Sequence, residues 1–245
     1  MRLVRLFVDT PLHPGSEISL PEGTARHALR VLRLRTGDPV TLFNGNGQQY
    51  LARLTADDPR SARVLVEDTA SPVRESPLRV VLLQAVARGE KMDWIIQKAI
   101  ELGVARIVPM VTERSEVHLD VARGEKRLER WRAVAIAACE QCGRNVVPPI
   151  DAPLALSARM AALAGAESEA RWMLHPGGIA RIRDITPPAT NMLLAVGPEG
   201  GFGEHDLAVL RAAGFRELTL GPRILRTETA GLAALSALQT AWGDF

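Results

Sequence analysis

The spacing of hydrophobic and polar residues divides the chain into two parts. In the first part, polar and apolar residues alternate over short runs, which predict strands at 2–8, 39–43, 49–54 and 62–66. Glycine- and aspartate-containing turns at 44–47 and 56–59 interrupt these runs, and 24–32 has helical spacing. Residues 1–72 are therefore expected to form a β-rich module of antiparallel strands with one short helix.

From residue 78 onward, continuous apolar runs alternate with helical patterns. The runs predict buried strands at 79–86, 106–111, 146–150, 171–174, 192–196 and 218–220. Helices are expected at 91–102, closed by Gly103, at 125–141, at 154–163, after the glycines at 200–201, and at 230–242. This order predicts an α/β domain with a mostly parallel sheet over 73–245, and the proline-containing stretch at 71–77 is its linker to the first module.

Two glycine-marked loops follow predicted strands near the end of the chain, VGPEGGF at 196–202 and LGPRILRTETA at 220–230. Their glycines permit sharp turns and close approach of a ligand to the main chain, although plain turns are an alternative. Neither loop has the spacing of a dinucleotide fold or a P-loop. A third loop, LHPG at 174–177, also follows a predicted strand. Because ligands collect beyond the carboxyl ends of strands in such sheets, we expect one pocket.

The second loop carries Arg226, Thr227 and Glu228 just before an alanine-rich helix. Thr227 is the expected N-cap, and Glu228 suits the positive end of the helix. Capping does not account for Arg226, because a cation at a helix start is unfavourable without an anionic or polar partner. Arg226 is therefore a candidate functional residue.

The chain resembles the small-subunit ribosomal RNA uridine-N3 methyltransferases, which are SPOUT-class enzymes that use S-adenosylmethionine. The resemblance rests on both loops together with RHALRVLRLRTGD and NGNG near the start and RGEKMDWIIQKAIELGV and EQCGR in the middle. It implies a trefoil-knotted C-terminal sheet with helices on both faces and an N-terminal β-barrel similar to PUA domains. It also implies a homodimer and a small-subunit ribosomal RNA substrate within the assembled subunit. A cytoplasmic location is expected separately, because the sequence has no apolar run as long as a membrane span and no signal-peptide segment at 1–10.

The resemblance implies that S-adenosylmethionine is held by the three loops. The expected cofactor-binding residues are Leu174, His175, Gly197, Glu199, Gly200, Gly201, Leu220, Gly221, Ile224, Leu225 and Thr229. Transfer to uracil N3 requires loss of its proton and stabilisation of the resulting charge on the carbonyl oxygens. Glu228, or less favourably Glu199, is the candidate base, and Arg226 is the candidate donor to an oxygen. This chemistry requires no metal.

Several basic residues are candidates for RNA contact. His27, Arg30 and Arg33 cluster in the first module, and Arg114 and Arg144 lie on predicted loops of the second. A solvated charged edge, or a surface ion pair for Arg114 and Arg144, is the alternative. The net charge of +2 gives weak support for a nucleic-acid partner.

Cys139 and Cys142 form a C-x-x-C near the end of the predicted helix 125–141. The sequence offers no second pair for a zinc site, so buried, reduced thiols are favoured over a redox pair. The last helix is apolar nearly all round, which predicts further burial in a homodimer. No apolar run has the length of a membrane span.

Two other functions remain open. One is a non-enzymatic RNA-binding or ribosome-assembly protein, against which the intact glycine loops and Arg226-Thr227-Glu228 argue. The other is a SPOUT methyltransferase that acts on another RNA position, because the choice of N3 rests on the resemblance alone.

Overall fold

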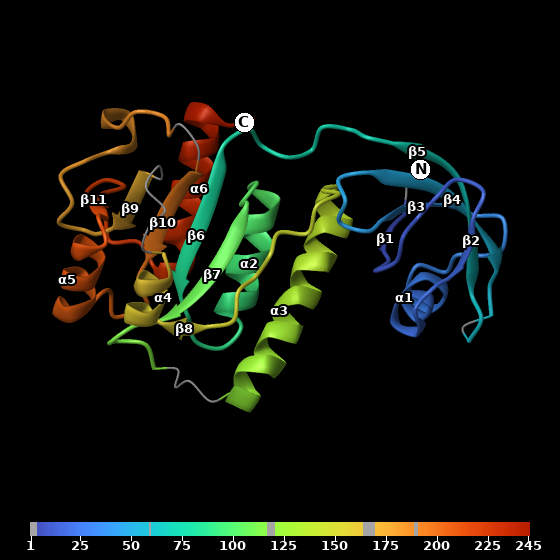
Figure 1. The fold of residues 1–245 in the computed structure, drawn as a ribbon, viewed down its shortest axis with the longest axis horizontal. Coiled ribbons are helices and arrows are strands. Elements are labelled where there is room, and N and C mark those ends of the chain that lie inside the picture. The colour runs from blue at the N-terminus through green and yellow to red at the C-terminus, as the bar shows by residue number, and fades with distance from the viewer. Residues whose placement is uncertain (1–3, 59, 117–120, 164–169, 189–190) are drawn as a thin grey trace. The chain divides into compact units, whose positions relative to one another are not determined.

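A computed structural model describes residues 4–58, 60–116, 121–163, 170–188 and 191–245, without the side chains of 121–123. The described chain forms two compact units (Figure 1). The first contains residues 1–75 and 136–147, and the second contains residues 76–135 and 148–245. The end of one long helix thus belongs to the first unit, while the boundary at 72/73 stays a prediction.

The first unit is built on a five-stranded sheet in the order β1-β3-β4-β5-β2. Its strands are β1 (Val4–Phe7), β2 (Glu17–Ser19), β3 (Pro39–Phe43), β4 (Gln49–Ala56) and β5 (Arg63–Ala70). Most pairs are antiparallel as predicted, but β1 pairs with β3 in parallel. The long connection between these two strands, which holds the unpredicted β2 and the helical segment, allows this pairing. Alternate residues such as Leu42, Leu54 and Val64 form the core.

The helix predicted at 24–32 consists of two elements. A short α1 (Glu22–Arg26) continues into η1 (His27–Val31), which has π-helical hydrogen bonding. Ala25, Ala28 and Leu29 face the core of the unit. His27, Arg30 and Arg33 are exposed, so the basic face of this segment is turned to solvent.

The second unit contains a six-stranded sheet in the order β11-β9-β10-β6-β7-β8. Its strands are β6 (Arg79–Ala85), β7 (Arg106–Val111), β8 (Leu154–Ala155), β9 (Ala170–Leu174), β10 (Asn191–Val196) and β11 (Arg216–Leu218). All pairings among the described strands are parallel, as the apolar runs predicted. The central β10 and β6 are buried along nearly their whole length, which explains why they read as continuous apolar runs.

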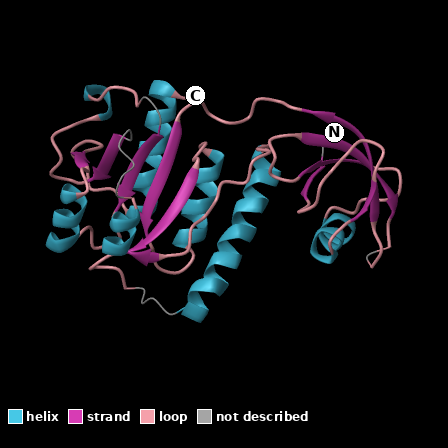
Figure 2. Ribbon diagram, in the orientation of Figure 1, coloured by secondary structure: helices cyan, strands magenta, loops and turns pink. Residues whose placement is uncertain are grey.

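Helices cover both faces of this sheet (Figure 2). On one face, α4 (Leu156–Ala162) and α5 (Glu204–Ala212) pack on Leu83, Leu193 and Ala195. On the other, α6 (Thr227–Trp242) contacts β6, β10 and α2 (Lys91–Glu101). A Cβ at Gly231 of α6 would meet side chains of Val196, Gln84 and Leu82 at 3.4–3.6 Å, which is ordinary van der Waals contact, so α6 packs directly on the sheet at this point.

Several predicted elements differ in the structure. In the helix predicted at 154–163, Leu154 and Ala155 form the strand β8 and α4 begins at Leu156. The last helix, α6, begins at Thr227, three residues before the predicted start. Residues 146–150 form no strand beyond a bridge between Ile150 and Ile107, since Pro148 and Pro149 have no N–H to donate to a ladder. The last strand, β11, ends at Leu218 rather than at 220. The helix predicted from 125 is α3 (Val121–Cys142), which begins four residues earlier. A short 3-10 element, η2 (Ile182–Asp184), was not predicted.

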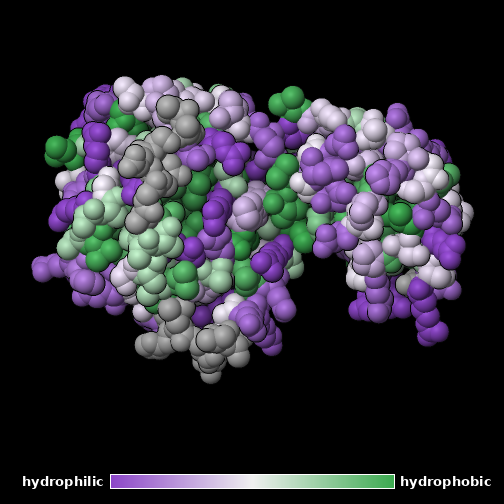
Figure 3. Space-filling model, in the orientation of Figure 1, coloured by the Kyte–Doolittle hydropathy of each residue, from purple (hydrophilic) through white to green (hydrophobic). Residues whose placement is uncertain are grey.

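The visible surface of each unit mixes hydrophilic and hydrophobic residues (Figure 3). Among the described residues, none of the helices is both long enough and apolar enough to cross a membrane.

Candidate functional site

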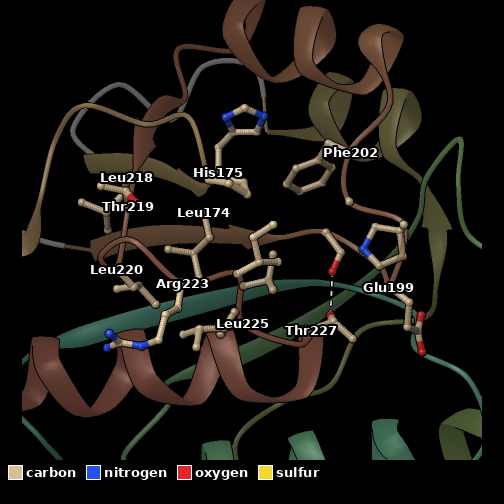
Figure 4. A pocket seen from close by; sticks show the side chains of 18 of the residues that line it. Leu174, His175, Glu199, Phe202, Leu218, Thr219, Leu220, Arg223, Leu225 and Thr227 are labelled. Atoms are coloured by element: carbon tan, nitrogen blue, oxygen red, sulfur yellow. Dashed lines mark hydrogen bonds between the residues drawn. The ribbon is translucent and has the colours of Figure 1, made fainter.

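A cavity of about 290 Å³ lies beyond the carboxyl ends of the neighbouring strands β11, β9 and β10 (Figure 4). The three loops that follow these strands line it together, as the sequence pattern predicted for one shared pocket. The lining residues are Arg114, Leu174, His175, Pro176, Val196, Gly197, Pro198, Glu199, Gly200, Gly201, Phe202, Leu218, Thr219, Leu220, Gly221, Arg223, Ile224, Leu225, Thr227 and Ala230.

Of the eleven residues expected to bind a cofactor, Thr229 does not line this cavity, and its side chain is exposed on α6. The sequence reasoning missed other lining residues that stand beside the chosen ones. Val196 and Leu218 end the strands, Phe202 closes the first loop, and Arg223 stands in the second. These residues lie close in sequence to the loop glycines, and that position is the signal that could have identified them.

The loop after β10 depends on glycine at two positions. A Cβ at Gly197 would lie 3.1 Å from the backbone nitrogen of Phe202 and 3.2 Å from the carbonyl carbon of Gly201. Gly201 has a φ of 69°, which few residues other than glycine adopt, and its N–H donates to the carbonyl of Pro198 at 2.9 Å. The loop therefore folds back tightly and presents its main chain to the cavity.

A buried hydrogen-bond chain fixes this loop to the start of α6. The Thr227 hydroxyl donates to the carbonyl oxygen of Gly197 at 2.6 Å and accepts from Gln84 Nε2 at 3.0 Å. Thr227 is therefore not the N-cap that the sequence suggested; the cap is Arg226, and Thr227 is the first helical residue. Gln84 was missed, although a glutamine within the apolar run of β6 is the signal that marks it.

The loop after β9 holds His175 by its own backbone. The Gly177 N–H donates to His175 Nδ1 at 3.1 Å, and Glu217 Oε2 lies 3.4 Å from the same nitrogen. These contacts favour a structural role for the ring, while the residue also lines the cavity.

Arg114 reaches the first loop from the segment after β7. Its guanidinium donates to the carbonyl oxygen of Gly200 at 2.9 Å, so it borders the cavity. Asp206, which is buried at the start of α5, accepts from the N–H groups of Glu113 and Gly203. These bonds hold the Arg114 segment against the loop, and its role in RNA binding stays a prediction.

A cluster of opposite charges lies beside the cavity. Lys91 Nζ is 3.0 Å from Glu199 Oε1 and 3.6 Å from Glu228 Oε2. Its hydrogen bond to Glu199 raises the pKa of Lys91. Burial opposes ionisation of Glu199, but its own backbone, Lys91 and the Arg88 N–H together lower the pKa of that carboxyl.

The two predicted catalytic side chains stand in different surroundings at the start of α6. Arg226 is exposed at the cap position. Glu228 is partly buried, and its Oε2 is shielded from solvent with no hydrogen-bond donor among the described residues. Sequence spacing placed the pair at the helix start correctly, but it did not identify Lys91 as the neighbour of Glu228.

Arg144 lies in the first unit and is 6% exposed. Its guanidinium pairs with Glu75, and its carbonyl oxygen accepts from the guanidinium of Arg5. The neighbouring Asn145 accepts a second hydrogen bond from Arg5 at 2.7 Å. This burial favours the ion-pair alternative over the RNA contact predicted for Arg144.

The two cysteines lie in the last turn of α3, and both are free thiols. Cys139 is buried, and burial raises its pKa to about 12, while Cys142 is partly exposed. The Cys139 Sγ is 3.6 Å from the carbonyl oxygen of Val146. A thiol that resists ionisation in this way is a poor nucleophile, which favours the structural interpretation.

Comparison with known families adds two matches that cover most of the chain. A family described as an RNA methyltransferase domain matches residues 74–239. A family described as an RNA methyltransferase PUA domain matches residues 20–67. The second match identifies the N-terminal unit as PUA-like.

The chain is also similar to curated proteins over nearly their full length. It is 30% identical to Ribosomal RNA small subunit methyltransferase E of Buchnera aphidicola subsp. Acyrthosiphon pisum, over 100% of this chain and 96% of that protein. It is 33% identical to the protein of the same name from Bacillus subtilis, over 96% of this chain and 95% of the other.

Two solved structures with bound cofactor superpose over the whole chain. One is a Ribosomal RNA small subunit methyltransferase E from Neisseria gonorrhoeae bound to S-adenosyl methionine, with a TM-score of 0.93, 38% identity and 100% of each chain covered. The other, from Legionella pneumophila, is described as a methyltransferase in complex with S-adenosylmethionine, with a TM-score of 0.95, 37% identity and the same coverage.

Proposed function

The chain belongs to the ribosomal RNA small subunit methyltransferase E family, and from that membership we propose that it methylates N3 of a uridine. It is a methyltransferase of small-subunit ribosomal RNA that uses S-adenosylmethionine. The choice of N3 follows from the resemblance described above. Neither Arg226 nor Glu228 lines the cavity, but both flank the lining residue Thr227 at the start of α6, and this placement supports the proposal.

The main support for the proposal is the cavity at the ends of β9, β10 and β11. Leu174, Leu220 and Leu225 offer apolar surface for the faces of an adenine ring, and the bent loop at Gly197 brings main-chain groups to the cavity. The residues present therefore fit S-adenosylmethionine. Leu174, Gly197, Leu220 and Leu225 would hold it, and when bound it supplies an electrophilic methyl group on sulfur.

Glu228 and Arg226 have separate tasks in this proposal. Glu228 accepts the N3 proton of uridine, because a carboxylate that adjoins the cavity-lining Thr227 is placed to act as a general base. Arg226 extends from the helix start and donates to a uracil oxygen, where negative charge collects as the proton leaves. The loops align the reacting groups, which supplies much of the rate acceleration in a displacement reaction.

The first unit supplies RNA affinity in this proposal. His27, Arg30 and Arg33 are exposed on the α1–η1 segment, where they can contact phosphates without reading sequence. Arg114 supplies a further contact beside the cavity. We assign residues 1–72 to an RNA-binding PUA-like β-barrel and residues 73–245 to the methyltransferase domain, in line with the matches at 20–67 and 74–239.

The finer features of the proposal come from the family resemblance. They are a trefoil knot in the C-terminal domain, a homodimer and a substrate RNA within the assembled small subunit. The proposed cytoplasmic location rests on the sequence instead. The exposed Ile224 at the rim of the cavity and the exposed Ala233 on α6 support a second copy as the cover of this region.

The deciding experiment is incubation with methyl-labelled S-adenosylmethionine and small ribosomal subunits that lack the modification. Nuclease digestion and mass analysis of the nucleosides should place the label in N3-methyluridine. Free small-subunit RNA, assayed in parallel, distinguishes the assembled subunit from naked RNA as substrate.

Other results would redirect the proposal. Label in another nucleoside would contradict N3 and indicate a methyltransferase that acts on a different position. If the chain bound small-subunit RNA but neither bound the cofactor nor transferred label, the ribosome-assembly alternative would replace it.

A further inference from the structure

Lys91 begins α2, where its charge is unfavourable unless acids compensate for it. The first turn of a helix carries partial positive charge from free N–H groups, which favours acids there. The ammonium group is instead compensated from other parts of the chain, by Glu199 in the loop after β10 and by Glu228 in α6. One cation therefore serves two acids from the two segments that border the cavity.

The two glutamates depend on this cation. Glu199 and Glu228 would repel each other if Lys91 lost its charge, and both are only partly exposed, with side-chain exposures of 30% and 19%. Glu199 Oε1 also accepts from the Arg88 N–H at 3.2 Å, whereas Glu228 Oε2 has no described donor and faces Lys91. Lys91 is therefore the main compensating charge for Glu228.

Other charged groups near Lys91 are paired elsewhere. The Arg88 guanidinium pairs with Glu116, and Asp93, which lies two residues after Lys91 on α2, pairs with Arg130. Glu199 and Glu228 are thus the acids that face Lys91 within the part of the chain that the structure describes.

We infer that Lys91 is a positioning residue for methyl transfer, which ties the cofactor loop at Glu199 to Glu228 and places a positive charge beside the carboxylate that accepts the proton. This inference rests on the proposed function, because it assigns Lys91 a part in the proton transfer. The raised pKa of Lys91 agrees with a cation that persists through the neutral range. Lys91 does not touch the uridine in this scheme and acts through the two carboxylates.

The positive charge of Lys91 determines the direction in which the pH profile of kcat should change. A nearby cation favours the charged form of a carboxylate, and Lys91→Met removes the cation that faces Glu228. Because the base must be unprotonated, the acidic limb of the kcat profile then moves to higher pH. Lys91→Arg keeps the charge and should restore the wild-type limb, although its different shape reduces the maximal rate.

The test compares Lys91→Met, Lys91→Arg and wild type in single-turnover methylation of small subunits across pH. Lys91→Met should lose about twofold to tenfold in kcat at pH 6 and much less at high pH, because removal of one nearby opposite charge makes a carboxylate harder to ionise and only the ionised base accepts a proton. Lys98→Met is the matched control, since Lys98 lies on the same helix and pairs with Glu101 and Trp94 instead. Its pH profile should equal that of wild type.

Carbon-detected NMR titration of the glutamate carboxyl groups tests the same inference without RNA. The Glu228 signal, assigned by its loss in Glu228→Gln, should titrate at higher pH in Lys91→Met than in wild type. An unchanged titration, or a fall in kcat with an unchanged pH profile, would overturn the inference. If wild type bound cofactor but methylated no RNA, the proposed function would fail instead, and the NMR result would still decide whether Lys91 controls Glu228.

Discussion

Arg226 and Glu228 lie two residues apart at the start of α6, yet their surroundings give them different properties. Arg226 caps the helix with its side chain exposed, so it is free to meet a ligand that approaches from solvent. Glu228 has one oxygen shielded next to Lys91, so its charge depends on the protein around it. Substitution at each position should therefore affect turnover through a different cause.

Glu228→Gln removes the proton acceptor while keeping the size of the side chain. We expect kcat to fall about 10²–10⁴-fold, the usual contribution of a general base, with cofactor affinity unchanged. Single-turnover methylation and calorimetry of cofactor binding measure the two effects. Glu204→Gln, at an exposed acid in the first turn of α5, is the control. Normal turnover in Glu228→Gln would exclude Glu228 as the base.

Arg226→Ala removes a donor to the uracil oxygen. The expected loss in kcat is about 10²-fold, as for other preorganised donors to developing negative charge. Arg183→Ala provides the control, because Arg183 is an exposed arginine whose neighbour Asp184 is its ion-pair partner. A normal kcat with a raised KM for RNA would reassign Arg226 from catalysis to RNA binding.

Thr227 shows how a single hydroxyl joins three segments. Thr227→Val leaves Gln84 Nε2 and the Gly197 carbonyl without this partner, although the shape of the side chain is kept. Gln84 Nε2 keeps its hydrogen bond to the Ala85 carbonyl oxygen, so the Gly197 carbonyl is the group that loses its described partner. Because an unpaired buried acceptor costs about 1–3 kcal/mol, the free energy of unfolding should fall by that amount in denaturant titrations. Thr227→Ser should recover most of it, and the exposed Thr229→Val should have little effect. Equal losses in the two valine variants would contradict this role.

The secondary-structure elements of the second unit follow the sequence closely where local spacing suffices. The strand β7 coincides with the apolar run at 106–111, and α2 ends where Gly103 adopts a φ of 79°. The pattern failed at 146–150, where valines and an isoleucine suggested a strand that two prolines prevent. Apolar spacing therefore locates an element only if its backbone groups can also pair.

The loop after β10 offers a matched pair of glycine substitutions. Gly197→Ala places a methyl group against the backbone of Phe202 and Gly201, so the loop must shift. Gly200→Ala meets only the flexible side chain of Arg114 at 3.4 Å. We expect calorimetry to show cofactor affinity at least about tenfold weaker in Gly197→Ala, equivalent to 1.4 kcal/mol, and much less change in Gly200→Ala. Similar affinities in the two variants would contradict a role for the tight loop in binding.

At the scale of the whole molecule, the surface that packs against the apolar helix α6 bears on the oligomeric state. The structure already buries Ala234, Leu235 and Leu238 against the second unit, which accounts for one face of the helix. Ala233 and Ala241 remain exposed. Packing within one chain thus explains the apolar residues on one face of α6. The homodimer remains a prediction, and it rests on the exposed alanines of this helix.

Light scattering at micromolar concentration should give a mass about twice 26.6 kDa. Ala233→Glu should shift the protein toward monomer, because it introduces a charge into the proposed interface. Ala137→Glu, at an exposed alanine of α3, should leave the mass unchanged. A monomeric mass for wild type would contradict the dimer.

The sequence alone was sufficient to predict the parallel α/β unit, the β-rich unit before it and the loops that share one cavity. These features depend on local spacing, strand ends and glycines that lie within a few residues of each other. It also placed Arg226 and Glu228 together, since they lie in one turn.

The tertiary structure alone identified the partners of these residues. Lys91 reaches Glu199 across 108 positions and Gln84 reaches Thr227 across 143, while Arg144 pairs with Glu75 rather than facing solvent. Local patterns show that a side chain is polar, but they do not show what lies opposite it. That depends on the order of strands in the sheet and on which segments pack together, because contacts between distant residues form only when the chain is folded.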